Sequence, residues 1–295
     1  MSADGLIVVD KPAGMTSHDV VARIRRLAKT RRVGHGGTLD PMATGVLIIG
    51  VNRATRLLTY VIGSGKSYLA TMRLGQSTIT DDAEGEVTAT ASVEGVTDEA
   101  IRAGFDAQRG EIDQVPSAVS AIKINGERAY KRVRDGETVA IPSRRVTVSR
   151  LAILDIRRSA DADVIDVDID VTCSSGTYIR AIARDLGAAL GVGGHLTALR
   201  RTAVGGLTLA VAATLEQLEE RAPDVVGLPM ADAARQAFPQ RIATGEETRI
   251  LSHGGPLDPV GIDGPYAVFD QAGDLLAIVS ERDGRARAEI VLAAA

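Results

Sequence analysis

Apolar positions in the first quarter of the chain recur with strand-like and helix-like periods. Gly5–Asp10 is a short apolar run closed by the turn residues KPAG, which predicts a buried strand. From Ser17 to Lys29 the apolar positions share one face at helical spacing, so we expect a helix with Ser17 as its N-cap. The pattern then predicts a loop, a strand, a helix and a strand at Val33–Thr44, Gly45–Gly50, Ala54–Ile62 and Ser67–Leu74.

The middle of the chain alternates apolar and polar residues. Val146–Ile156 and Val164–Thr172 follow this period-two pattern and predict antiparallel strands. Thr177–Leu190 is helical by periodicity, and Thr214 with Gln217 matches a capping box at the start of another helix. Strands and helices are interleaved without a regular βαβ repeat. We therefore expect an α+β fold with a large mixed or antiparallel sheet and flanking helices.

A change in composition divides the chain. Residues 223–239 are punctuated by proline, which is typical of a linker. Residues 240–295 alternate glycine turns with short apolar runs, and this pattern predicts a small all-β module, a barrel or a sandwich. The expected domains are therefore 1–222 and 240–295.

Composition narrows the class of protein. Of the 295 residues, 45% are hydrophobic and 24% charged, which excludes wholesale disorder. No apolar run approaches the roughly 18 residues of a membrane span, and the N-terminus lacks the pattern of a secretory signal. The single cysteine, Cys173, is too few for a disulfide or a cysteine-based metal site. We expect a cytoplasmic protein without membrane association.

Charge is unevenly distributed along the chain. The net charge is −4, yet residues 1–75 carry eleven Lys and Arg against four Asp. Residues 123–150 carry eight bases against three acids, whereas residues 80–113 carry ten acids against two bases. Such segregation suits a protein with one face that meets phosphates, although ordinary solvated faces explain it equally well. Aromatic residues make up only 3%, which favours an enzyme that handles one base over a protein that coats a strand.

The segment GHGGTLDPMATGVLIIG, residues 34–50, is the most unusual in the chain. Its glycines let a backbone approach a ligand closely, and they surround His35, Thr38 and Asp40 ahead of a predicted strand. Alone, Asp40 before a proline would be a turn residue and His35 a structural histidine. The combination exceeds what a turn requires, so we interpret it as a functional loop.

Other chemistries find little support in the motifs. GSGKS at Gly63–Ser67 resembles a phosphate loop, but Tyr60 stands where the nucleotide-binding pattern needs glycine. A hydrolase built on the His35 loop would be expected to carry a G-x-S-x-G elbow, which does not occur. The four histidines lack metal-ligand spacing. We predict no metal and no cofactor.

Two further residues stand out from their surroundings. Tyr68 begins the predicted strand Ser67–Leu74, where a half-buried structural tyrosine is the plain interpretation. Arg180 lies between apolar Ile179 and Ile182 in a predicted helix, so it should need an acidic partner.

Taken together, these segments resemble the TruB family, the bacterial tRNA pseudouridine-55 synthases. The matching pieces are Asp10-Lys11-Pro12, GHGGTLDPMATGVL, KSYLATMRLGQSTITDDAEG, QVPSAVSAIKINGERAYKRVRDG, CSSGTYIRAIARDLG and GGHLTALRRTAVG. Ser117-Ala118-Val119 differs from the family's usual sequence at this point, and the difference affects no catalytic position. Residues 240–295 are similar to the small PUA-like β-barrel domain of these enzymes.

The resemblance implies roles for individual residues. Asp40 would be the essential carboxylate, Tyr68 would pack on the target base, and Arg180 would pair with Asp40 and favour its ionised form. His35 would fill the space left by the flipped base, and Leu199 would pack beside it. Further contacts to substrate or RNA are implied for Lys11, Tyr178, Lys123, Arg132, Arg134, Arg144 and Arg145, the last five in a basic RNA-binding insertion at residues 114–150.

The resemblance also implies the reaction. Uridine 55 in the T loop of tRNA would be flipped out and isomerised to pseudouridine by a catalytic domain spanning residues 1–222. Asp40 would attack C1′, attack C6, or assist elimination through a glycal. The partner would be the T arm of tRNA, met by a monomer without an obligate protein partner. The alternative is an RNA-binding or tRNA-folding protein in which catalysis is secondary.

Overall fold

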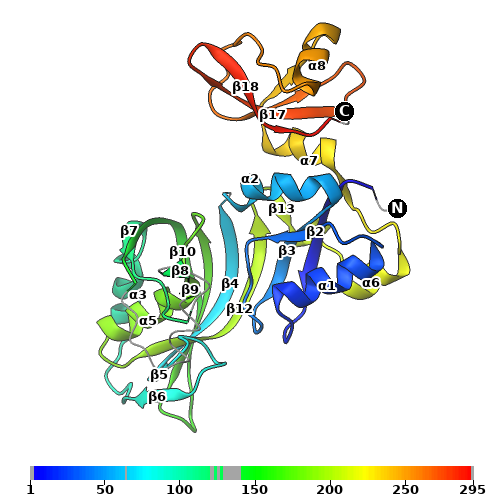
Figure 1. The fold of residues 1–295 in the computed structure, drawn as a ribbon. Coiled ribbons are helices and arrows are strands. Elements are labelled where there is room, and N and C mark those ends of the chain that lie inside the picture. Colours follow the sequence, from blue (N-terminus) through cyan, green and yellow to red (C-terminus); the bar gives the residue numbers. More distant parts are fainter. Residues whose placement is uncertain (1–2, 64, 120–122, 125–126, 129–140, 294–295) are drawn as a thin grey trace.

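The computed structural model describes residues 3–293 apart from 64, 120–122, 125–126 and 129–140. One large sheet dominates it (Figure 1), and the α+β class is confirmed. The strands along its main path are β14 (Leu228–Pro229), β1 (Gly5–Lys11), β3 (Thr44–Val51), β12 (Gly194–Val204), β4 (Lys66–Leu74), β11 (Ile165–Cys173), β10 (Arg144–Arg158) and β7 (Gly110–Gln114). Off this path, β2 (Val33–Gly36) pairs with β3, and β13 (Leu207–Thr208) pairs with β12.

The sheet consists of two halves joined at a narrow junction. The first half-sheet comprises β14, β1, β2 and β3, and the second comprises β12, β4, β11, β10 and β7. β3 meets β12 in parallel through only two residue pairs, Arg200 with Thr44 and Arg201 with Gly45. Gly45 has φ +95°, and a Cβ there would lie 2.2 Å from the Arg201 carbonyl oxygen. Only glycine therefore permits the two half-sheets to approach.

The second half-sheet comes from one continuous part of the chain. All of its strands lie between residues 66 and 204, whereas the first half-sheet uses segments before and after this range. The two ends of the inserted part meet, because the Gly205 amide donates to the Gly65 carbonyl at 2.8 Å. The inserted part thus leaves and rejoins the first half-sheet at one place.

Helices cover the sheet unevenly. α3 (Asp98–Asp106) and α5 (Ile179–Ala189) pack on the second half-sheet through a core that includes Phe105, Met72 and Leu186. α1 (Ser17–Leu27) and α6 (Leu215–Glu220) share a core with one face of the first half-sheet. The short helices η1 (Asn52–Leu57), α2 (Leu58–Ile62) and η2 (Leu209–Val211) complete the large domain, together with the small hairpins β5–β6 (Gln76–Thr78 and Val87–Thr90) and β8–β9 (Lys123–Ile124 and Glu127–Arg128).

The C-terminal part forms a small sheet in the order β15 (Gln240–Ile242), β16 (Tyr266–Phe269), β17 (Leu275–Arg282) and β18 (Arg285–Val291). It also contains helix α8 (Gly245–Ser252), so the all-β expectation was wrong on this point. The segment expected as a linker carries β14 and helix α7 (Met230–Ala237). Figure 1 shows the C-terminal sheet and α8 stacked on α7 and α2. The C-terminal sheet shares a hydrophobic core with the first half-sheet.

Two local expectations are corrected near the N-terminus. Thr16, not Ser17, is the N-cap of α1, in a capping box with Asp19. Residues 33–36 form strand β2 rather than loop, because they pair with β3. The capping box of Thr214 and Gln217 is confirmed. No helix in the described ranges is long and apolar enough to cross a membrane.

Candidate active site

A cavity of about 350 Å³ opens where the two half-sheets meet. Its walls come from the loop after β2, from β4, from the turn before α5 and from β12. The lining residues are Gly37, Thr38, Leu39, Asp40, Lys66, Tyr68, Ser175, Gly176, Thr177, Tyr178, Ile179, Arg180, Leu199 and Arg201. Five residues singled out from the sequence therefore share one cavity, namely Asp40, Tyr68, Tyr178, Arg180 and Leu199.

Asp40 is in ionic contact with Arg180. Arg180 Nε lies 3.1 Å from Asp40 Oδ2, and its Nη1 lies 3.2 Å from Asp82 Oδ2. Arg180 thus has the acidic partner that the sequence predicts, and it has two such partners, Asp40 and Asp82. Asp82, whose side chain is 3% exposed, was not singled out from the sequence, although it lies in the acidic TITDDAEG segment. Arg180 also donates to the carbonyls of Thr80 at 2.8 Å and Val119 at 3.1 Å, so its position is fixed from several sides.

The environment of Asp40 raises its pKa above the ordinary value for an aspartate. Burial is the largest cause, and the negative charge of Asp82 acts in the same direction. The positive charges of Arg180, Lys11 and Arg201 lower the pKa but do not outweigh burial. The expectation that Arg180 favours the ionised carboxylate gives the sign of its effect correctly. It omits the desolvation that opposes it.

The loop that carries Asp40 is anchored on both sides. The Ser17 hydroxyl donates to the Leu39 carbonyl at 3.1 Å and accepts from the Leu39 amide at 2.9 Å. Lys11 is fully buried, and its ammonium donates to the carbonyls of Met15 at 2.6 Å and Pro41 at 3.2 Å. Lys11 is not among the residues that line the cavity, and its expected contact with the substrate stays a prediction.

Tyr68 and Arg201 form the floor of the cavity beside Asp40. Tyr68 is only 6% exposed, and burial raises the pKa of its hydroxyl. The positive charge of Arg201 acts on that hydroxyl in the opposite direction. Arg201 is 1% exposed and was not singled out from the sequence, although it belongs to the HLTALRR segment. Lys66 also lines the cavity, and burial lowers the pKa of its ammonium.

His35 lies in β2 and outside the cavity lining. Its ring centroid is 5.2 Å from that of His18 in an edge-to-face arrangement. Its Nδ1 is buried and has no hydrogen-bond partner among the described residues. Burial lowers its pKa, and the charges of His18 and Arg201 act in the same direction. His35 is therefore a neutral ring close to the site.

The expected basic residues are only partly described. Arg132 and Arg134 lie outside the described residues, and Lys123 lies in β8. The Arg144 guanidinium stacks on the Tyr178 ring, 4.8 Å from its centroid, which brings Arg144 to the edge of the cavity. Arg145 is exposed and forms ion pairs with Glu111 at 3.2 Å and Asp113 at 3.5 Å. Such exposed pairs contribute little stability and leave Arg145 accessible to a phosphate.

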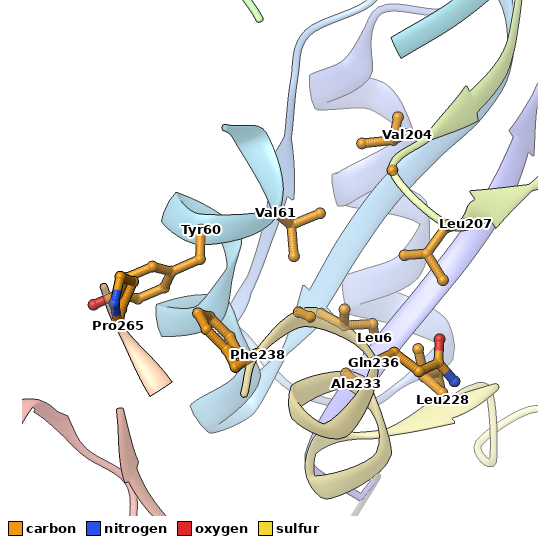
Figure 2. A pocket seen from close by; sticks show the side chains of 13 residues that line it. Leu6, Tyr60, Val61, Val204, Leu207, Leu228, Ala233, Gln236, Phe238 and Pro265 are labelled. Atoms are coloured by element: carbon orange, nitrogen blue, oxygen red, sulfur yellow. The ribbon is translucent and has the colours of Figure 1, made fainter. Parts of the chain in front are cut away.

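A second cavity, of about 380 Å³, lies between the large domain and the C-terminal domain. Figure 2 shows Tyr60 and Phe238 on one side of it and Val204 and Leu207 on another. Its lining residues include no Asp, Glu, Lys or Arg, and the Tyr60 hydroxyl is engaged with Glu289 at 2.7 Å. This cavity has no charged side chain in its lining, whereas the cavity around Asp40 has several, and the latter is therefore the candidate active site.

Comparisons with known proteins identify the family of this chain. Residues 25–179 match the family described as TruB family pseudouridylate synthase (N terminal domain). Residues 180–224 match the tRNA pseudouridylate synthase B C-terminal domain, and residues 238–293 match tRNA Pseudouridine synthase II, C terminal.

Curated relatives cover nearly the whole chain. A tRNA pseudouridine synthase B of Arthrobacter sp. (strain FB24) is 55% identical, over 98% of this chain and 96% of the relative. One of Streptomyces coelicolor is 56% identical, over 96% of this chain and 95% of the relative. The solved Cbf5-Nop10-Gar1 complex contains a chain that is 27% identical with a TM-score of 0.73, over 97% of this chain and 84% of that one.

Proposed function

This chain belongs to the TruB family of pseudouridylate synthases, and on that premise we propose that it converts uridine 55 in the T loop of tRNA to pseudouridine. The substrate class is supported by the names of its relatives, which are tRNA pseudouridine synthases. The observation that carries the proposal is the contact of Asp40 with Arg180 in the cavity that Tyr68 lines. The division into a catalytic domain at 1–222, with a basic insertion at 114–150, and an RNA-binding accessory at 240–295 is part of the same proposal.

The reaction is an isomerisation that needs no external group. The N1–C1′ bond breaks, the uracil turns, and C5 joins C1′ while the proton on C5 is lost and N1 gains one. Asp40 supplies the carboxylate, either as a nucleophile at C1′ or C6 or as an aid to elimination. Arg180 holds that carboxylate in place through a charge-assisted hydrogen bond. Each route uses the same ionised Asp40.

The target base must leave its stack before it can react. Flipping costs a few kcal/mol, which contacts in the pocket must offset. Tyr68 offers a flat surface to the uracil, and Leu199 and Tyr178 line the same cavity. The Tyr68 hydroxyl is also proposed to move a proton at C2′ if the route passes through a glycal. His35, which lies in β2 outside the lining of this cavity, is the residue proposed to fill the space left in the RNA.

Recognition of the RNA falls to basic side chains around the cavity. Arg144 and Arg145 lie on β10, and Arg144 stacks on Tyr178 at the edge of the cavity. With Lys123, Arg132 and Arg134 they are proposed to contact phosphates of the T arm. Recognition of this kind follows the shape of a folded loop and its splayed bases. The protein is proposed to act as a monomer and without a cofactor.

The test is mass mapping of pseudouridine in a T-arm stem-loop RNA after incubation with the pure protein and a chelator. We expect one pseudouridine, at the target uridine, and none in a control RNA with cytidine at that position. Binding without conversion would overturn the proposal and leave the alternative, an RNA-binding or tRNA-folding protein. Conversion that stops in chelator and returns with added metal would refute the metal-free mechanism.

A further inference from the structure

We propose that Arg201 is a positioning residue that fixes the Asp40 loop against Tyr68 across the junction of the two half-sheets. This inference rests on the proposed function. It concerns a side chain that the reaction as described above does not use.

The two groups to be positioned belong to different parts of the sheet. Asp40 follows β2, which belongs to the first half-sheet, and Tyr68 lies on β4 of the second. Between the two half-sheets, β3 and β12 share only two residue pairs. So short a backbone contact constrains the relative position of two large units weakly. Side chains that span the junction must supply the remaining constraint.

Arg201 spans the junction and reaches the catalytic loop itself. Its Nε donates to the Val46 carbonyl on β3 at 2.6 Å. Its Nη2 donates to the Gly37 carbonyl at 2.8 Å, and its Nη1 lies 3.5 Å from the Thr38 carbonyl. Gly37 and Thr38 are in the loop that leads directly to Asp40. One side chain from the second half-sheet therefore holds both β3 and the reactive loop of the first.

The same guanidinium interacts with the Tyr68 hydroxyl. Tyr68 and Arg201 face each other on adjacent strands, in register between β4 and β12. Arg201 thus contacts both groups whose spacing matters, the loop of Asp40 and the ring of Tyr68. A buried charge is costly, and here carbonyl oxygens replace the lost water around the guanidinium.

The geometry requires arginine rather than any cation. A guanidinium carries five donors in a rigid planar fork and can serve acceptors that lie in different directions. A lysine ammonium at the end of a flexible stem cannot hold Val46, Gly37 and Thr38 in the same fixed arrangement. Loss of this tie would let the loop shift, and a misplacement of about 1 Å can cost about 100-fold in rate.

Arg200 provides a matched control. It precedes Arg201 on β12 and spans the same junction, with hydrogen bonds to Asp10 at 2.7 Å and to the Thr44 hydroxyl at 3.3 Å. It does not line the cavity around Asp40. Substitution of Arg200 thus weakens the junction without touching the reactive loop or Tyr68.

The experiment compares Arg201→Lys and Arg201→Gln with Arg200→Lys and Arg200→Gln in the full-length protein. Single-turnover conversion of the T-arm stem-loop, RNA affinity and the folded fraction by circular dichroism are measured for each. We expect the Arg201 variants to bind RNA within about twofold of wild type while their single-turnover rate falls about 100-fold. The Arg200 variants should keep the wild-type rate.

Several results would overturn the inference. Wild-type turnover by Arg201→Lys would show that the fork is not needed. A parallel loss of binding, turnover and folded fraction in both Arg201 variants would make the residue a folding determinant only, and so would failure of both to fold. An equal loss in the Arg200 variants would assign the effect to the junction in general. If wild type binds the RNA but does not convert it, the proposed function fails, and this inference falls with it.

Discussion

Asp82 shares the guanidinium of Arg180 with Asp40. The two carboxylates lie 3.2 Å and 3.1 Å from different nitrogens of one side chain, and Asp82 is the more deeply buried of the two. Arg180 therefore balances two negative charges, and the charge of Asp82 raises the pKa of Asp40. A simple pair of Asp40 and Arg180, as expected from the sequence, would leave this coupling out.

Asp40→Asn should abolish conversion and leave RNA binding intact. We expect the rate to fall by about 10²–10⁴-fold or more, because the amide can neither attack nor accept a proton as the carboxylate does. Rate and affinity are measured on the T-arm stem-loop, with Asp170→Asn, which lies on β11 in an ion pair with Arg150, as the control. Retention of the wild-type rate would refute the catalytic assignment.

The same variant should be at least as stable as wild type at neutral pH. The pKa of Asp40 is raised above its ordinary 3.8, mainly by burial. A group of this kind contributes stability below its unfolded pKa and loses that contribution as the pH rises through its folded pKa. Asparagine carries no charge and avoids this loss. A lower melting temperature of Asp40→Asn at pH 7 would contradict the sign of the shift.

The pH dependence of turnover should reflect the pKa of Asp40 and the effect of Asp82 on that pKa. The proposed reaction requires ionised Asp40, so the rate should fall as the pH drops through the raised pKa of that carboxyl. In Asp82→Asn a negative charge is lost, the pKa of Asp40 falls, and the acidic limb moves to lower pH. Single-turnover rates across pH test this, and the position of the limb does not depend on how much protein is folded. A limb that stays in place would show that the two carboxylates are not coupled.

Arg180→Lys should reduce both turnover and stability. Lysine keeps the charge but loses the fork that holds Asp40 and Asp82. Sequence reasoning alone predicts a loss of turnover with little effect on folding. The structure changes this prediction, because Asp82 is 3% exposed and would remain as a poorly compensated buried carboxylate. Removal of one partner of such a buried pair costs about 3–5 kcal/mol, and because lysine keeps the charge we expect a smaller loss, measured by denaturant titration. An unchanged rate would refute the pairing with Asp40.

Neutralisation of Arg132, Arg134, Arg144 and Arg145 together should weaken RNA binding and flatten its salt dependence. Each lost phosphate contact should reduce the slope of log K against log salt by about 1. Arg158 serves as the control, since it lies at the far end of β10 in an ion pair with Asp98. Binding curves at several salt concentrations decide the matter. An unaltered slope would remove these arginines from the interface.

Truncation before residue 240 should destabilise the large domain as well as weaken RNA binding. Phe269, Leu275 and Ile278 of the C-terminal sheet share a core with Leu6 and Ile48 of the first half-sheet. Removal of the sheet would expose this apolar surface to water. The sequence alone predicts that this truncation affects RNA affinity more than chemistry, with the terminal module as an RNA-binding accessory. A truncated protein with an unchanged melting temperature would support that simpler view.

Local signals in the sequence were sufficient for elements that depend on nearby residues. The period-two pattern of β10 and β11 and the capping box at Thr214 with Gln217 are properties of short segments, and both are present. Arg180 was recognisable because a cation among apolar neighbours must find an acid. The candidate site was recognisable from Asp40 and its glycine-rich surroundings.

The features that the sequence does not predict depend on contacts between residues that are far apart in the chain. Thr16 and Ser17 are both good caps, and Ser17 is excluded because its hydroxyl is engaged by Leu39. Strand β2 exists only through pairing with β3. Arg200 and Arg201 are equivalent in the sequence. Their orientation follows from the register of β12, which places Arg201 beside Tyr68 and Arg200 beside Leu69.

The hydrogen bond between Gly205 and Gly65 closes residues 66–204 into a unit whose ends touch. That unit is inserted between the chain segments that form the first half-sheet. Asp40 lies outside the inserted part, whereas Tyr68 and Arg180 lie within it. The residues proposed to react therefore come from two parts of one chain, as they would from two subunits of a dimer, and the proposed catalytic centre is complete only when the inserted part is docked on the first half-sheet.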